Sequence, residues 1–189
     1  VSVVRVPIVA RRKGVFFRAL NYLSFVVSGS LYTLFTRFRA DVVFSCETSP
    51  VLQTLPAIVY QKRRRVPLVL YCCDIWPECL KVWNVRESDW LFRRMHTLSR
   101  YIYRQGDIVP ISSPPFRAYL REVNGIPDDK MVELPQHAED LYSGIAGQYE
   151  ENGCADFLFA GNIGAAQQVD CLILSLIHIS EPTRPLYIS

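Results

Sequence analysis

Short runs of apolar, mostly β-branched residues alternate along the chain with longer stretches of helical periodicity. This alternation is typical of repeated β-α-β units around a parallel sheet. We therefore predict an α/β fold with a Rossmann-like parallel sheet flanked by helices. The predicted strands are Val3–Ile8, Asp41–Cys46, Leu68–Cys73, Asp107–Ile111, Met131–Leu134 and Asp156–Ala160.

Two helices are predicted from apolar residues that recur every three or four positions. One spans Ser88–Arg104, and the other contains Phe116, Leu120 and Val123 and ends at Gly125. In both cases the apolar residues fall on one face, which is the face we expect against the sheet.

The segment Ala19–Thr36 holds 18 consecutive uncharged residues, the lower limit for spanning a bilayer. Arg18 and Arg37 flank it, and its aromatic side chains favour a membrane interface. The pattern leaves three alternatives open, namely a buried or membrane-surface helix, a transmembrane span, and two shorter helices broken at Gly29.

Composition places the chain among ordinary globular domains. It has 189 residues, of which 50% are hydrophobic and 21% are charged, so we expect a sizeable core and not a disordered chain. The net charge of +3 does not argue for nucleic acid, and we expect none as a partner. The basic residues gather in Arg11–Lys13, Lys62–Arg65 and Arg93–Arg94, which are either solvated helix ends or patches that attract anionic lipid or phosphate.

Cysteine usage points to a reducing compartment. The six cysteines include the adjacent pair Cys72 and Cys73, and none has the C-x-x-C spacing of a zinc or redox site. The sequence shows neither a secretory signal nor an initiator methionine at Val1, so we expect a cytoplasmic protein that begins further upstream.

The strongest chemical signal follows the uncharged run Leu68–Cys73, which predicts a strand buried on both faces. Asp74, Trp76 and Glu78 come directly after it. Open α/β sheets bind ligands at the carboxyl ends of their strands, so chemistry is expected near Asp74.

A glycine turn follows the predicted strand Asp156–Ala160. Backbone N–H groups at Gly161, Asn162 and Gly164 could face a phosphate there, although any tight turn uses such residues. From about Leu174 the sequence resembles a translated sequencing-library adapter, so we predict that the tail is foreign to the protein.

Four motifs together resemble glycosyltransferase family 4, specifically its WbuB-like sugar transferases of bacterial surface-polysaccharide assembly. The resemblance covers nearly all of the chain up to about Ile173. The motifs are Asp74–Glu78, Ile111–Arg117, Leu134–His137 and Phe159–Gly164.

The resemblance implies the two-domain GT-B fold, with the acceptor held mostly by the first domain and the nucleotide sugar mostly by the second. We expect residues 1–150 to form the first domain, 151–173 to open the second, and 174–189 to be the foreign tail. It also implies sugar transfer with retention of configuration and without an obligatory metal or other cofactor. The implied partners are a nucleotide sugar, a lipid-linked saccharide acceptor and the inner face of the cytoplasmic membrane, to which the protein would bind peripherally.

One departure from the family pattern concerns the donor diphosphate. Where many relatives carry Gly-Arg and a later Lys-Gly, this chain has Gly161-Asn162 and Gln167-Gln168. Diphosphate binding is then left to backbone amides near Gly164, or to residues beyond this chain. The fragment by itself is expected to be inactive.

The acceptor implied by the resemblance gives the candidate residues specific roles. Asp74 is the candidate catalytic carboxylate for an acceptor hydroxyl, with Glu78 as its partner, because nearby carboxylates raise each other's pKa. Trp76 is a candidate wall for the acceptor. A helix-capping acid, a surface acid and a core tryptophan are the respective alternatives.

Other polar residues follow neighbouring strands and are predicted to share the same edge. Glu47 and Ser49 follow Asp41–Cys46. For His137, near the end of the domain, a loop histidine is the alternative to an acceptor contact. Ser112 and Ser113 follow Asp107–Ile111, and helix capping is the alternative for these two serines. The remaining acceptor candidates are Ser112, Ser113 and His137.

Two other function classes stay open at this point. One is a sugar-nucleotide epimerase of the same GT-B architecture, which needs neither acceptor nor membrane. The other is a non-catalytic, membrane-associated binding subunit.

Overall fold

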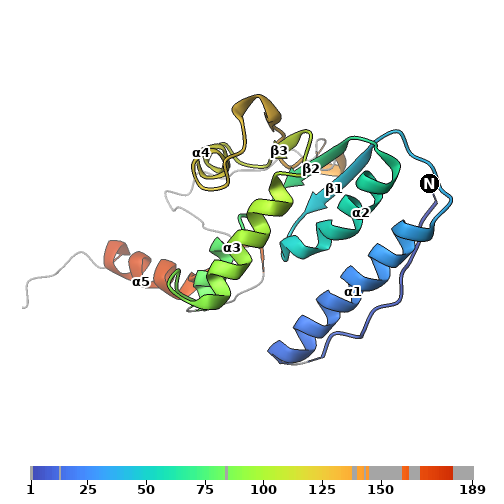
Figure 1. Ribbon diagram of the computed structural model, residues 1–189. Helices are drawn as coiled ribbons and strands as arrows, with labels where there is room; N and C mark the ends of the chain where they lie inside the picture. The colour runs from blue at the N-terminus through green and yellow to red at the C-terminus, as the bar shows by residue number, and fades with distance from the viewer. Residues whose placement is uncertain are drawn as a thin grey trace, which may run out of the picture. The chain divides into compact units, whose positions relative to one another are not determined.

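A parallel sheet of four strands organises Val1–Ala138, the first of two compact units in the chain; the second is Glu139–Ser189. The computed structural model describes residues 2–12, 14–83, 85–137, 140–142, 144, 159–161 and 167–180. The strands lie in the order β1-β2-β3-β4 (Figure 1), and this confirms the predicted α/β, Rossmann-like fold. Their bounds are β1 (Val43–Glu47), β2 (Leu68–Cys72), β3 (Val109–Ile111) and β4 (Met131–Glu133).

The register aligns the carboxyl ends of the strands. Glu47 pairs with Cys72, Cys72 with Ile111, and Ile111 with Glu133, so the four residues form one row across the sheet. Residues that follow this row therefore leave the sheet along a single edge. Four of the six predicted strands are confirmed to within two residues, whereas Asp156–Ala160 lies partly outside the described residues.

The core lies on one face of the sheet. Leu68, Leu70 and Cys72 are fully buried there, whereas Val69 and Tyr71 between them are only half-buried. The prediction that this strand is buried on both faces is therefore wrong. An uncharged run marks a strand, but valine and tyrosine also suit a partly exposed pleated surface.

Helices connect the strands and supply the rest of the core. The predicted Ser88–Arg104 helix is confirmed as α3, and the helix through Phe116 as α4. The helices of the first unit are α1 (Val15–Phe35), α2 (Leu55–Arg64), α3 (Trp90–Tyr103) and α4 (Pro115–Glu122), with short 3-10 turns η1 (Val51–Thr54), η2 (Glu78–Trp83) and η3 (Asp128–Lys130). In the second unit, η4 spans Asp140–Tyr142 and α5 spans Val169–Ser180.

Helix α1 is continuous, so the alternative of two helices broken at Gly29 is wrong. It lies beside α2 (Figure 1), and Gly29 faces Pro56, where an added Cβ atom would stand 2.9 Å from the proline Cγ. Glycine is retained here because the two helices approach closely, not because the helix ends. No helix among the described residues has the length and apolarity needed to cross a membrane.

The predicted strand Val3–Ile8 is wrong, because residues 2–12 form an extended segment outside the sheet. Side chains of α1 satisfy this segment instead. The Asn21 amide donates to the Val9 carbonyl (2.5 Å), and the Val9 N–H donates to Ser24 Oγ (2.9 Å). These bonds reach Val9, the residue after the predicted strand, and hold that part of the segment against α1.

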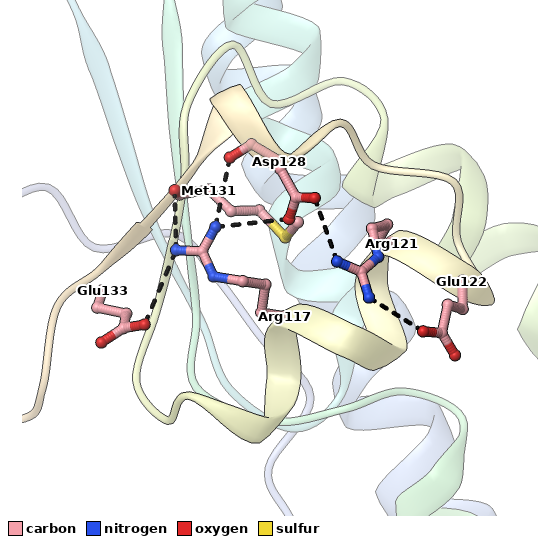
Figure 2. Close-up of polar contacts among 6 residues, drawn as sticks. All are labelled: Arg117, Arg121, Glu122, Asp128, Met131 and Glu133. Atoms are coloured by element: carbon pink, nitrogen blue, oxygen red, sulfur yellow. Dashed lines mark hydrogen bonds and ion pairs between the residues drawn. The ribbon is translucent and has the colours of Figure 1, made fainter.

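Arg117 of α4 anchors the edge strand β4 (Figure 2). Its guanidinium donates to the carbonyls of Met131 (3.2 Å) and Asp128 (3.4 Å), and lies 3.9 Å from the Glu133 carboxylate. Arg121 reaches the Asp128 carboxylate at 3.2 Å. The α4 helix therefore holds both the η3 turn and the start of β4 through one arginine that binds main-chain oxygens.

Candidate active site

The loops that leave β1, β2 and β3 stay joined beyond the strands. The Cys73 N–H donates to the Glu47 carbonyl (2.9 Å), and the Ser112 N–H donates to the Cys72 carbonyl (3.1 Å). Asp74 follows Cys73 directly. The sheet edge thus brings Glu47, Asp74 and Ser112 together on adjoining loops, as the strand pattern predicted.

Tyr103, the last residue of α3, holds the turn from Asp74 to Trp76. Its buried hydroxyl donates to the Asp74 carbonyl (3.0 Å) and accepts from the Trp76 N–H (3.2 Å). The Cys72 thiol donates to the same carbonyl (3.3 Å). Three bonds from the core thus fix the backbone of the residues that carry the candidate chemistry.

Ser49 and Trp76 meet across the edge. The indole Nε1 donates to Ser49 Oγ at 3.1 Å, and the peptide bonds to Pro50 and Pro77 are both cis. Trp76 is 8% exposed, so most of the ring packs into the protein. The core interpretation of Trp76 is therefore confirmed, and its role as a wall for the acceptor stays a prediction.

Two hollows lie between this edge and α1. One, of about 190 Å³, is lined by Val15, Arg18 and Tyr22 of α1 together with Ser49, Trp76, Cys79 and Leu80. The other, of about 220 Å³, also includes Ser49 and Tyr22. The rest of its lining comes from the N-terminal segment, α1, η1 and the residue before η1. Its other lining residues are Ile8, Asn21, Phe25, Pro50 and Gln53. The site thus has a largely apolar flank that α1 provides.

Glu78 has partners other than the predicted one. Tyr119 Oη donates to Glu78 Oε1 (2.7 Å), and Lys81 forms an ion pair with Oε2. Both oxygens of Glu78 thus bind groups other than Asp74. Burial raises the pKa of Tyr119 most, and the hydrogen bond to the Glu78 carboxylate raises it further. We correct the predicted pairing with Asp74: at Glu78 the chain enters η2, which directs the carboxylate toward α4.

Glu78 lines a separate hollow of about 770 Å³ that carries several charged side chains. Its walls come from η2, α3 and α4, and Lys81 bridges Glu78 and Glu87 inside it. The Lys81 ammonium also stands over the Phe92 ring, 5.6 Å from its centroid. The other lining residues are Arg93, His96, Thr97, Tyr119 and Val123.

Glu47, predicted to bind acceptor, is fully buried at the end of β1. Burial, with a smaller contribution from the Asp74 carboxylate, raises its pKa to about 9. The side chain is therefore protonated at neutral pH and has no surface to offer a ligand.

The other predicted residues differ in placement. Ser112 and Ser113 are half-buried at the end of β3, and Ser112 Oγ donates to the Cys73 carbonyl (3.5 Å). Neither serine caps α4, whose N-cap is Pro114 without a side-chain bond. His137 is exposed in the segment after β4.

The predicted donor residues belong to the second unit. Gly161 is exposed there, whereas Asn162 and Gly164 lie outside the described residues. Within the described residues, His, Cys, Asp and Glu do not gather in groups of three or more that could hold a metal. That the reaction needs no metal stays a prediction, as do the donor site and the foreign tail.

Two tyrosines of the site were missed from the sequence. Tyr103 and Tyr119 lie on helices whose apolar spacing was recognised, but their hydroxyls face loops distant in sequence. The one available signal was that a buried tyrosine hydroxyl needs a hydrogen-bond partner.

Fold and site together define a parallel α/β domain with candidate ligand-binding residues at the carboxyl edge of its sheet. A family model described as a glycosyl transferase 4-like domain matches residues 1–137. The chain belongs to this glycosyltransferase family, and this confirms the resemblance seen in its motifs. It therefore acts in sugar transfer, with a sugar donor and an acceptor as substrates. The search of curated proteins found no match to the chain.

Proposed function

We propose that this domain binds the acceptor in transfer of a sugar from a nucleotide-sugar donor to a lipid-linked saccharide during bacterial surface-polysaccharide synthesis. The observation that carries the proposal is the contact of Ser49 with Trp76, two residues after Asp74, beside two hollows walled by α1. A saccharide with a lipid tail needs both a polar edge and an apolar flank. The family resemblance supports retention of configuration.

In this proposal Asp74 is the acceptor carboxylate. Its backbone is fixed by Tyr103 and Cys72, so its side chain leaves a rigid turn. A carboxylate can accept a hydrogen bond from the attacking hydroxyl and orient it. Ser49 and Trp76 supply the adjoining wall.

Helix α1 supports location of the domain at the membrane surface. Leu20, Leu23, Val27 and Leu31 recur at helical spacing and are exposed along one face. Such a face, with arginines before and after the helix, suits the boundary between lipid headgroups and acyl chains. The protein would then meet its acceptor at the cytoplasmic face of the membrane.

Asp74→Asn tests the proposal in the enzyme that carries this domain. Transfer of a labelled sugar to membrane-extracted lipid-linked saccharide should fall at least about a hundredfold, the lower range for loss of an acid-base group. Hydrolysis or binding of the donor should stay nearly unchanged. Asp129→Asn, which changes an exposed acid beyond α4, is the matched control.

Unchanged transfer by Asp74→Asn would contradict the role of Asp74. Incubation with the nucleotide sugar alone separates the proposal from the epimerase alternative, because only an epimerase converts the donor without an acceptor. Absence of both reactions in the wild-type enzyme would favour the non-catalytic alternative.

A further inference from the structure

The Glu47 carboxyl is the most unusual polar group in the first unit. It is 0% exposed, and within the described residues its oxygens make no hydrogen bond of full geometry, although the Cys72 thiol, the Tyr103 hydroxyl and the Asp74 backbone lie close enough to lower its pKa in part. Burying an unpaired carboxylate is costly, so such a group becomes neutral or finds a cation. A buried polar group of this kind calls for an explanation.

Among the described residues, the groups that interact electrostatically with Glu47 include no cation. These groups belong to β2, the turn after it, η2 and α3, and each is an acid, a thiol or a phenol. They are Cys72, Cys73, Asp74, Cys79 and Tyr103. Protonation is therefore the route by which Glu47 becomes neutral.

Glu47 shares its surroundings with the two side chains that hold the Asp74 turn. Cys72 and Tyr103, which both bind the Asp74 carbonyl, also influence the pKa of Glu47. All three side chains are fully buried. They form a polar layer directly beneath the turn, and an ionised Glu47 would put a second negative charge behind Asp74.

We propose that Glu47 is a positioning residue whose neutral carboxyl completes the buried layer under the Asp74–Trp76 turn and leaves Asp74 as the charged acid at this part of the edge. The proposal rests on the proposed function only for the role of Asp74. Glu47 then supports the turn and does not contact the acceptor, because a fully buried side chain cannot touch an acceptor in this conformation. Ionisation of Glu47 should disturb the turn, since it introduces a buried charge without a partner.

Trp76 can report on the turn without any substrate. In a Trp83→Phe, Trp90→Phe background Trp76 is the sole tryptophan, as the chain has three. We expect its emission to change between pH 8 and 10 with a midpoint near 9, the pKa expected for Glu47. Glu47→Gln, which keeps the shape but cannot ionise, should show no such change.

An identical alkaline transition in the Glu47→Gln variant would overturn the proposal, as would a midpoint near the ordinary glutamate pKa in the parent. Tyr101→Phe is a matched control, since it removes an exposed phenol of the same helix whose hydroxyl contacts Lys62 and not the turn. It should keep the transition that Glu47 causes.

Transfer activity supplies a separate readout in the enzyme that carries this domain. The wild-type rate should fall above about pH 9, and Glu47→Gln should lack this alkaline fall. Failure of the fluorescence test contradicts the role of Glu47 alone, whereas absence of sugar transfer in the wild type contradicts the proposed function alone. The two failures are therefore distinguishable.

Discussion

Buried polar side chains determine how the candidate chemistry of this domain is presented. Tyr103 binds the turn at two points, and Glu47 lies in the same layer. A neutral acid at this place has a thermodynamic effect as well as a positioning one. Its pKa is about 4.5 in an unfolded chain and about 9 in the folded domain.

The stability of the domain should therefore depend on pH. Between these two values the folded state holds a proton that the unfolded state has released, so the free energy of unfolding falls as the pH rises. The slope that Glu47 contributes is at most about 1.4 kcal/mol per pH unit. Urea unfolding at pH 5 and pH 8 should show a larger loss for the wild type than for Glu47→Gln. Equal losses in both proteins would show that Glu47 ionises normally in the folded state.

Residue-level prediction from sequence succeeded where the backbone decided the outcome. Asp74 and Ser49 follow parallel strands, and parallel strands end at one edge whatever the side chains are. It failed for Glu78, because the direction of a side chain in a turn depends on partners such as Tyr119, 41 positions away. Burial of Glu47 was equally hidden, since its sequence neighbours include exposed residues.

At the scale of elements, strand prediction depended on what else satisfies the backbone. The four strands of the sheet were predicted correctly, because each of these segments pairs with a neighbouring strand. Val3–Ile8 has the same composition, but α1 lies alongside and its Asn21 and Ser24 bind Val9. The local hydrophobic pattern of a segment carries no information about a competing partner elsewhere in the chain.

The edge strand β4 should depend on Arg117 more than on any exposed ion pair nearby. Arg117→Ala removes bonds to two main-chain carbonyls and should cost about 1–2 kcal/mol, with faster amide hydrogen exchange in β4 and η3. Arg121→Ala is the matched control, because Arg121 binds only exposed side-chain carboxylates (Figure 2) and should cost less than about 1 kcal/mol. Equal exchange rates in the two variants would contradict an anchoring role for Arg117.

At the scale of the whole molecule, the exposed face of α1 should decide binding to lipid. The matched pair consists of two double variants that each remove two exposed apolar side chains: one variant changes α1, and the other changes the residue before β1 and a residue of β4. Leu23→Ser with Val27→Ser should weaken binding to vesicles of phosphatidylglycerol and phosphatidylcholine at least about tenfold. Val42→Ser with Val132→Ser should leave binding nearly unchanged. Co-sedimentation measures both, and equal effects would contradict a lipid-facing α1.

The position of Tyr103 at the end of a helix has a consequence for heat tolerance. Helix ends open before helix centres, so the turn that carries Asp74 is tied to one of the less stable parts of α3. Arg104, the next residue, donates from Nε to the Asn124 carbonyl (3.0 Å) and so fastens that end to the segment after α4. On warming, the turn that carries Asp74 should therefore be lost when this end of α3 leaves the core, in which Ile102 and Tyr103 are fully buried.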